Sequence, residues 1–299
     1  MIITKASLAA AYTGFNAAFQ SGFAPVAARR TPIVMETKST TREETYPWMK
    51  DIPGFRPWAG DRVVNNIGAH SFTIRNVSFE QTVGVDRENF EDDQLGTYAT
   101  LFKALGEEAA VFPDRLVFEF LKTADSVPCY DGQYLCDTDH PIERPDGSIA
   151  SVSNFQAGAS PPWFLMDLSR TLKPVVLQTR KPLNNLVRKD SENDDNVFHS
   201  KKFLYGSDGR LAVGAGLWQL IYMSRAALTP ANYEAARAAF ATFKKDKTDQ
   251  PLGIEPTHLV FGGSNEGAAR SIVISENATG GESNRWKGTA ELLKVPYLA

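Results

Sequence analysis

The strongest constraint on the fold of this 299-residue chain is one long stretch of helical periodicity. Its apolar residues recur at steps of three and four: Leu95, Tyr98, Phe102, Leu105, Ala109, Phe112, Leu116 and Phe120. Pro113 lies inside the stretch, where a proline is expected to bend a helix without ending it. Capped by Asp92 and Asp93, a helix over residues 93–122 would be on the order of 45 Å long. A rod of that length exceeds a compact small domain and predicts a spine.

Shorter patterns predict a second helical region in the last third of the chain. Thr229 before Pro230 combines a capping side chain with a first-turn proline, which predicts a helix start. The residues expected to form its buried stripe are Tyr233, Ala236, Phe240 and Phe243. Residues 258–261 indicate a buried strand, and a turn and a short helix over residues 266–274 are expected to follow it.

The first 50 residues indicate an arm and not a compact domain. Leu8, Tyr12, Phe15 and Phe19 fall at helical spacing, which favours an amphipathic helix over a cleaved signal peptide. The polar run that follows offers little to bury, so an arm lying on a neighbouring subunit and a flexible lead-in are both open. Residues 72–85 then alternate as strands do, with a break that indicates a bulge or the bend of a long hairpin.

Composition and charge exclude several classes of protein. The 32 Lys and Arg against 35 Asp and Glu give a net charge of −3, with both signs mixed along the chain. A protein that grips nucleic acid needs a concentrated basic face, and the sequence contains no such run. Two cysteines favour a reducing compartment. No apolar run approaches the roughly 20 residues of a membrane span. We therefore expect a soluble cytoplasmic protein that does not bind membranes.

The densest group of reactive side chains consists of Cys129, Cys136, Asp137, Asp139 and His140. Zinc prefers thiolate and imidazole ligands, and Asp-x-Asp-His resembles fragments of many hydrolases. The cysteine spacing is not that of a zinc finger or ribbon, however, and the neighbouring residues have good turn chemistry. Buried cysteines also serve simply as small apolar residues. The group therefore predicts a structural turn, with a metal or catalytic site as the lesser alternative.

Two other patterns match binding loops only in part. Residues 262–267 lie between a predicted strand and a predicted helix, but they lack the Lys-Ser/Thr ending of a phosphate loop. Asp190, Glu192 and Asp194 alternate like calcium ligands without the expected Gly and closing Glu, which favours a solvated acidic loop. The sequence therefore predicts no catalytic, cofactor-binding or metal-binding residues and no cofactor.

Several short segments spread along nearly the whole chain form a recognisable series. They are residues 79–85 (FEQTVGV), 90–98 (FEDDQLGTY), 128–133 (PCYDGQ), 137–141 (DTDHP), 167–170 (DLSR), 172–174 (LKP), 178–180 (QTR), 214–219 (GAGLWQ), 251–258 (PLGIEPTH) and 287–292 (KGTAEL). Taken in order, these segments resemble the major head subunit family of Mu-like bacteriophages. No single segment is diagnostic, but together and in this order they are specific. The segment with Cys129 and His140 keeps the family pattern, which favours a structural turn there.

The resemblance implies an α+β fold, the tailed-phage capsid fold named for phage Hong Kong 97. In that fold an amino-terminal arm and an extended loop reach over neighbouring subunits. A peripheral domain carries a long spine helix, an axial domain points to the centre of the capsomer, and the last residues return to the peripheral domain as a strand. The implied boundaries are residues 1–50 for the arm, 51–80 for the extended loop and 81–148 for the peripheral domain. The axial domain would cover residues 149–284, and the returning strand would cover residues 285–299.

On this resemblance we expect a structural subunit and not an enzyme. Its copies would assemble into hexamers and pentamers that form an icosahedral head around double-stranded DNA, without sequence-specific binding. Assembly would take place in the host bacterial cytoplasm with a scaffold protein and a head protease, and a portal and decoration proteins would complete the virion capsid. Two alternatives are a cargo-encapsulating nanocompartment of the same fold and a metal-dependent hydrolase that uses Asp137, Asp139 and His140.

One property of the resembling family can be compared directly with this sequence. Some capsids of this fold crosslink themselves through Lys–Asn isopeptide bonds, with the lysine on the extended loop. No lysine occurs between Asp51 and Val85. The sequence therefore predicts a shell that is not crosslinked and is held by buried apolar area and loop exchange.

Overall fold

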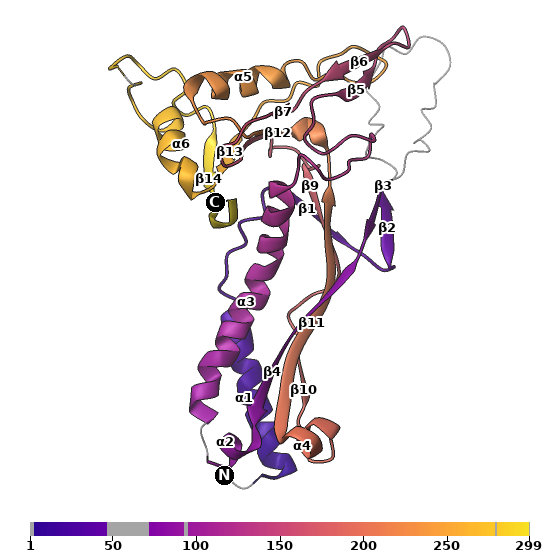
Figure 1. Cartoon of the computed structure of the whole chain (residues 1–299), viewed down its shortest axis with the longest axis vertical. Coiled ribbons are helices and arrows are strands. Elements are labelled where there is room, and N and C mark those ends of the chain that lie inside the picture. Colours follow the sequence, from indigo (N-terminus) through magenta and orange to yellow (C-terminus); the bar gives the residue numbers. More distant parts are fainter. Residues whose placement is uncertain (1–2, 47–71, 93–94, 279, 299) are drawn as a thin grey trace.

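The dominant element of the computed structural model is helix α3 (Leu95–Lys122), whose 28 residues run through Pro113 (Figure 1). The residues that the structure describes are 3–46, 72–92, 95–278 and 280–298. At 1.5 Å per residue α3 is about 42 Å long, so the predicted spine is confirmed. Although α3 is long, neither it nor any other described helix is apolar enough to cross a lipid bilayer.

One five-stranded sheet runs alongside the spine helix. Its strand order is β1-β9-β11-β10, and β4 also pairs with β11. The strands are β1 (Val34–Lys38), β4 (Val77–Asp86), β9 (Val175–Lys181), β10 (Leu186–Lys189) and β11 (Lys202–Ala215). The 14 residues of β11 pair antiparallel with β4 in its first part and with β9 in its second. This long strand and α3 make the lower part of the molecule narrow and elongated (Figure 1).

A second five-stranded sheet, of order β14-β13-β8-β12-β7, forms the upper part. Its strands are β7 (Phe155–Gln156), β8 (Trp163–Met166), β12 (Ile221–Ser224), β13 (His258–Phe261) and β14 (Glu291–Lys294). Helices α5 (Pro230–Phe240) and α6 (Glu266–Val273) pack against this sheet. The Thr229 hydroxyl accepts a hydrogen bond from the Asn232 N–H at 3.2 Å, as expected of a helix cap. The predicted helix starts and the buried strand are therefore confirmed.

Two small ribbons and several short helices complete the fold. The ribbons pair β2 (Glu43–Tyr46) with β3 (Phe72–Arg75), and β5 (His140–Glu143) with β6 (Ile149–Val152). The short helices are α2 (Arg87–Glu91), α4 (Asp195–Ser200), η1 (Trp218–Leu220), η2 (Gly263–Asn265) and η3 (Pro296–Leu298). The predicted break in residues 72–85 falls at Asn76, between β3 and β4. Asp92 closes α2, whereas Asp93 and most of the expected extended loop lie outside the described residues.

The amino-terminal helix α1 (Lys5–Phe23) packs on the spine of its own chain. Phe15 and Phe19 are buried, and the Phe15 ring stacks on the Phe102 ring of α3 at a centroid distance of 4.2 Å. The amphipathic helix expected here is therefore confirmed, and its apolar face is buried within its own chain. Its apolar stripe has a matching stripe on α3, and sequence periodicity identifies a buried face without identifying its partner.

The two sheets divide the chain differently from the expected boundaries. Residues 149–284 contribute β9, β10 and β11 to the sheet beside the spine, although that range was expected to form one axial unit. The carboxyl-terminal strand β14 pairs with β13 in the upper sheet, and η3 beyond it contacts α3. There the Tyr297 and Phe118 rings stack at 6.1 Å. The reason is that strand periodicity specifies a pleated, half-buried segment but not the strand beside it.

Glycines allow the close approach of α1 to α3. An alanine substitution is therefore expected to lower the free energy of unfolding at a contact glycine and to raise it at a glycine outside the contact. A Cβ on Gly106 would lie 2.0 Å from the Phe19 carbonyl oxygen. We expect Gly106→Ala to destabilise the chain by about 1–3 kcal/mol because the helices must separate. Gly14→Ala on α1, whose Cβ would meet nothing within 4 Å, should instead stabilise by about 0.5–1 kcal/mol. Thermal unfolding of both variants measures this, and two shifts of the same sign would contradict the packing.

Candidate functional site

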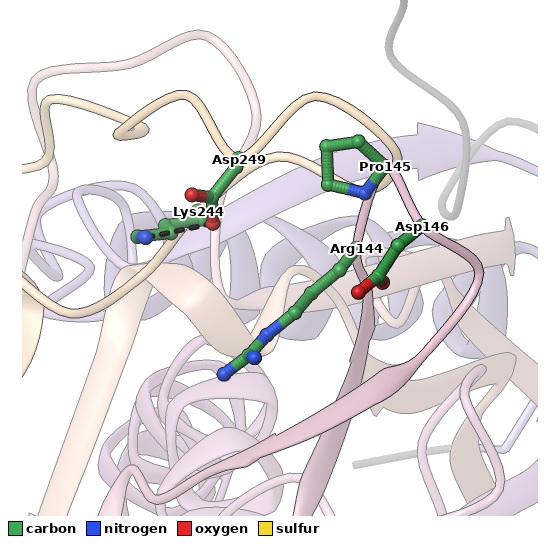
Figure 2. Close-up of a pocket in the computed structure, with 5 residues that line it drawn as sticks. All are labelled: Arg144, Pro145, Asp146, Lys244 and Asp249. Atoms are coloured by element: carbon green, nitrogen blue, oxygen red, sulfur yellow. Dashed lines mark hydrogen bonds and ion pairs between the residues drawn. The ribbon is translucent and has the colours of Figure 1, made fainter.

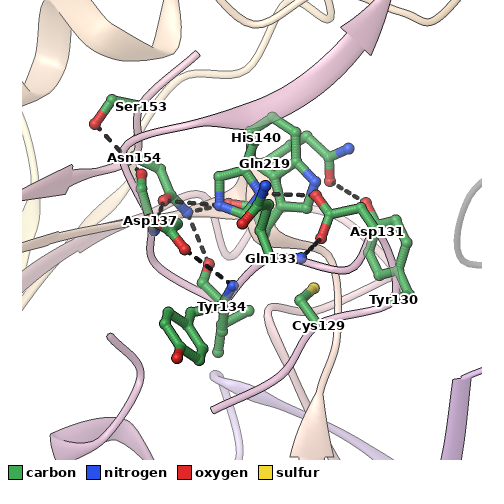
Figure 3. A network of polar contacts seen from close by, with 12 residues as sticks. Cys129, Tyr130, Asp131, Gln133, Tyr134, Asp137, His140, Ser153, Asn154 and Gln219 are labelled. Atoms are coloured by element: carbon green, nitrogen blue, oxygen red, sulfur yellow. Dashed lines mark hydrogen bonds and ion pairs between the residues drawn. The ribbon is translucent and has the colours of Figure 1, made fainter. Parts of the chain in front are cut away.

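His140 is the centre of a polar network in the segment that follows α3 (Figure 3). The side chain is fully buried at the start of β5. Its Nδ1 lies 2.7 Å from Asp131 Oδ2 and its Nε2 lies 3.1 Å from Asn154 Oδ1. The imidazole also stacks on the Trp218 ring at 4.0 Å and 8°. Both ring nitrogens and one ring face are therefore engaged by the chain itself.

The hydrogen-bond directions in this network follow from Asn154. Its Nδ2 faces the carbonyl oxygens of Leu135 at 2.9 Å, Trp218 at 3.1 Å and Ile221 at 3.2 Å. Carbonyl oxygens only accept, so Nδ2 donates to them and Oδ1 accepts from His140. The Asp131 carboxylate accepts from the other ring nitrogen. Both ring nitrogens therefore face partners within the chain, which leaves neither nitrogen free to act as a base or to bind a metal.

The residues of the hydrolase hypothesis do not converge. The Asp137 carboxylate accepts backbone hydrogen bonds from Tyr134 at 3.1 Å and Thr138 at 2.7 Å, which closes the turn. Asp139 is exposed, whereas His140 is buried. Adjacent residues of an extended segment point to opposite sides, so this spacing in sequence separates the side chains in space. The turn expected at Tyr130 and Asp131 is confirmed, whereas His140 and Pro141 form the start of strand β5 and not a turn.

The two cysteines lie in the same segment as apolar core residues. Cys129 and Cys136 are both free and buried. Burial raises the pKa of each thiol. Metal binding and nucleophilic attack require the thiolate, so both side chains are unreactive at neutral pH. Within the described ranges, no group of three or more His, Cys, Asp or Glu side chains is placed to hold a metal ion.

The acidic run near β10 is not a uniformly solvated loop, so that prediction is wrong in part. Asp190 is buried and accepts a hydrogen bond from the Tyr205 hydroxyl at 3.1 Å. Burial and the Asp190 charge raise the pKa of Tyr205. Glu192 forms an exposed ion pair with Arg87 at 3.4 Å, and Asp194 accepts from the Ser191 N–H at 2.9 Å. Each of the three carboxylates therefore makes a different kind of contact: a buried hydrogen bond, an exposed ion pair and a hydrogen bond to the backbone.

Residues 262–267 form a plain strand–turn–helix connection, as predicted. They follow β13, form η2 and begin α6. The Asn265 side chain, which is buried, donates to the Pro161 carbonyl oxygen at 3.1 Å. This bond ties the turn to the loop before β8, so the segment connects two parts of the upper sheet.

A surface hollow of roughly 480 Å³ lies where the β5–β6 ribbon meets the loop after α5 (Figure 2). Its lining consists of Arg144, Pro145, Asp146, Lys244 and Asp249. Lys244 pairs with Asp249 at 2.7 Å, and Asp146 accepts from the Ser148 N–H at 2.9 Å. Small-molecule pockets are mostly apolar and enclosed, whereas four of these five residues are charged. The hollow therefore has the character of ordinary protein surface.

Large apolar side chains exposed at separate places are the features that sequence reasoning missed. Phe198 on α4 is 80% exposed, Ile149 on β6 is 65% exposed, and Ile274 after α6 is 53% exposed. None belongs to a periodic apolar stripe, so each had no sequence signal beyond its own residue type. Apolar side chains exposed singly are common on protein surfaces, so none of the three by itself marks a functional site.

The buried network predicts a large stability effect at His140. His140→Phe keeps an aromatic ring against Trp218 but removes both donors and leaves Asp131 without its partner. We expect a loss of about 3–5 kcal/mol in the free energy of unfolding. Asp139→Asn, on the exposed neighbour, should change it by no more than about 0.5 kcal/mol. Chemical denaturation of the two variants provides the measurement, and similar small losses in both would show that the network is not structural.

Comparison with known proteins identifies the relatives of this chain. The family model described as Mu-like prophage major head subunit gpT matches residues 8–298. The chain is 37% identical over 309 residues to the major capsid protein of Escherichia phage Mu, covering 100% of both chains. It is 36% identical over 281 residues to the Mu-like prophage FluMu major head subunit of Haemophilus influenzae, covering 92% of this chain and 91% of that protein.

Solved structures agree with these sequence relatives. A chain from the procapsid of bacteriophage JBD30 has a TM-score of 0.85 at 35% identity, covering 99% of this chain and 100% of that chain. A chain from the JBD30 capsid has a TM-score of 0.78 at 26% identity and full coverage of both. The α+β fold is thus that of Hong Kong 97-type phage capsid subunits. With these likenesses over its full length, the chain belongs to the family of Mu-like prophage major head subunits.

Proposed function

We propose that copies of this chain assemble with one another into the closed icosahedral head of a Mu-like phage or prophage. The observation that carries the proposal is the full-length likeness to the major capsid protein of phage Mu, at 37% identity. Rings of six and five copies would form the faces and corners of the shell. The role is structural and not enzymatic, in keeping with a buried His140 and with relatives that are capsid proteins.

The two sheets suggest domain boundaries that differ from those expected from the resemblance. We assign α1, α3 and the sheet containing β11 to the peripheral domain, and the sheet containing β8 with α5 and α6 to the axial domain. The assignment rests on which strands pair and not on their order along the chain. The proposed extended loop keeps its expected start at residue 51 but ends before β4, because residues 77–80 pair with β11 in the peripheral sheet.

Other partners follow from the same proposal. Double-stranded DNA would be enclosed and not gripped, because a net charge of −3 with mixed signs gives no basic face to neutralise phosphates. Assembly would take place in the bacterial cytoplasm with a scaffold protein and a head protease, followed by attachment to a portal and by decoration proteins. The virion capsid is the final location of the chain.

A nanocompartment shell of the same fold is the second candidate. It would be favoured if particles purified from cells retained one specific enzyme in fixed proportion to the shell chain. The relatives named as phage head proteins favour the phage role, and particles that contain DNA or are empty would support it.

Self-assembly is the first expected outcome. We expect the purified full-length chain, expressed alone or with its scaffold, to form closed shells, tubes or isolated rings in electron micrographs. The reason is that exposed apolar side chains such as Phe198 are stabilised by burial against other copies. A monodisperse monomer or dimer, persisting at high concentration with scaffold supplied, would contradict the proposal.

The second expected outcome concerns covalent linkage. The stretch from Asp51 to Val85 has no lysine, so the extended loop offers no amine for an isopeptide bond. Mature particles boiled in denaturing detergent should therefore run as a single band at the mass of the monomer. A ladder of multiples would show crosslinks and would refute this prediction.

A further inference from the structure

The ribbon of β2 and β3 is attached to the molecule through hydrogen bonds from a buried side chain of the main sheet. It is a separate two-stranded sheet that projects beside the main sheet (Figure 1). Isolated two-stranded ribbons are marginally stable in water, so its position depends on what holds it. Its apolar support is a small cluster distinct from the main core, formed by Tyr46, Ile74, Val176 and Ala212.

A buried amide of β9 holds both strands of the ribbon. Gln178 is 0% exposed, and its Oε1 accepts from the Tyr46 hydroxyl of β2 at 2.9 Å. Its Nε2 donates to the Ile74 carbonyl of β3 at 3.2 Å and to Asn76 Oδ1 at 2.9 Å. The Ile74 carbonyl can only accept, which determines the orientation of the amide and the direction of every bond around it. The Gln178 side chain therefore hydrogen-bonds to one polar group on each strand of the ribbon and to the Asn76 side chain that directly follows it.

The two points where the chain enters and leaves the ribbon are joined to each other. Asn76, which follows β3, donates from Nδ2 to Ser39 Oγ at 2.7 Å and to the Thr41 carbonyl at 3.0 Å. Ser39 and Asn76 are both buried. The Glu44 carboxylate accepts from the Thr40 N–H at 2.9 Å, and this bond contributes most to lowering the pKa of Glu44. These hydrogen bonds join the segment before β2 to Asn76, which follows β3, at the base of the ribbon.

A glycine of β11 provides the space in which the ribbon rests. A Cβ on Gly214 would lie 2.3 Å from Ile74 Cδ1 and 2.7 Å from Ile74 Cγ1. The backbone of Gly214 is not in the left-handed region, so alanine is compatible with the strand itself. The glycine is needed for the close approach of Ile74 and not for a turn.

We infer that Gln178, Asn76, Tyr46 and Gly214 form a ribbon seat that sets the direction in which β2–β3 leaves the main sheet. The inference rests on the proposed function, because the consequence of a set direction is that every copy presents the ribbon to its neighbour in the same way. The seat is polar and separate from the main core, so it can be loosened while the rest of the subunit stays folded. These residues position the ribbon for assembly.

The test compares the same substitution at two glycines of one sheet. Gly214→Ala forces Ile74 out of the seat, whereas Gly84→Ala on β4 meets only side-chain atoms at 3.3 Å or more. Hydrogen exchange followed by mass spectrometry on the unassembled full-length chain should show amides of residues 43–46 and 72–75 exchanging about tenfold faster in Gly214→Ala alone. Exchange in the strands β9 and β11 should stay the same. Adding Ile74→Ala should abolish most of the effect of Gly214→Ala, because the clashing atoms are gone.

Assembly of the same variants tests the positioning role. We expect Gly214→Ala to give fewer closed shells and more irregular particles than Gly84→Ala under identical conditions. Unchanged ribbon exchange, or exchange raised across the whole sheet, would overturn the seat. Loosened ribbons with normal yields of closed shells would overturn its role in assembly. If the unaltered chain formed no shells, the proposed function would fail, and the exchange comparison would still decide whether the seat exists.

Discussion

The contact between α1 and α3 is the constraint on which the lower part of the molecule depends. Gly22 and Gly106 let the two helices approach so closely that a Cβ on either would overlap a carbonyl oxygen of the other. This approach brings Phe15 against Phe102, and the Tyr205 ring of β11 meets both edge-on at 5.3 and 5.4 Å. Two helices and the long strand therefore share one aromatic core, which keeps a narrow body rigid along its length.

The upper part is joined to this rod through a shared apolar core and through polar contacts at the end of α3. Arg225, which follows β12, donates to both carboxylate oxygens of Asp125 at 2.6 and 3.1 Å and to the Lys122 carbonyl at 2.8 Å. A bidentate guanidinium at a helix carboxyl end satisfies free carbonyls and complements the helix dipole. The His140 network lies in the segment just beyond. Directional bonds of this kind determine an angle between two bodies more sharply than apolar packing alone does.

These buried polar groups also explain why the reactive-looking residues of this segment do not form a reactive site. His140, Asp131 and Asn154 are hydrogen-bonded to one another and to the backbone around them, and burial raises the pKa of the Cys129 and Cys136 thiols. Catalysis needs groups that are poised and accessible, whereas these are satisfied and enclosed. The exposed chemistry is instead apolar and mixed in charge, which suits a subunit whose partners are copies of itself.

The sequence by itself determined the local elements with good accuracy. The spacing from Tyr98 to Phe120 specified the spine, Thr229 and Pro230 specified the start of α5, and the alternation around Asn76 specified two strands. These features depend on neighbouring residues, whose geometry a periodic pattern records directly. Together with the ordered family segments they were sufficient for the fold class.

Only the tertiary structure decided which elements meet. It placed α1 on the spine of its own chain, divided residues 149–284 between two sheets and put β14 beside β13. It also showed that Asp190 is buried and that Gly214 and Gln178 hold a ribbon distant from them in sequence. Such contacts are set by the shapes of whole surfaces brought together by folding. A strand or a helix stripe of given pattern fits several partners equally well, so the choice is not encoded within any one segment.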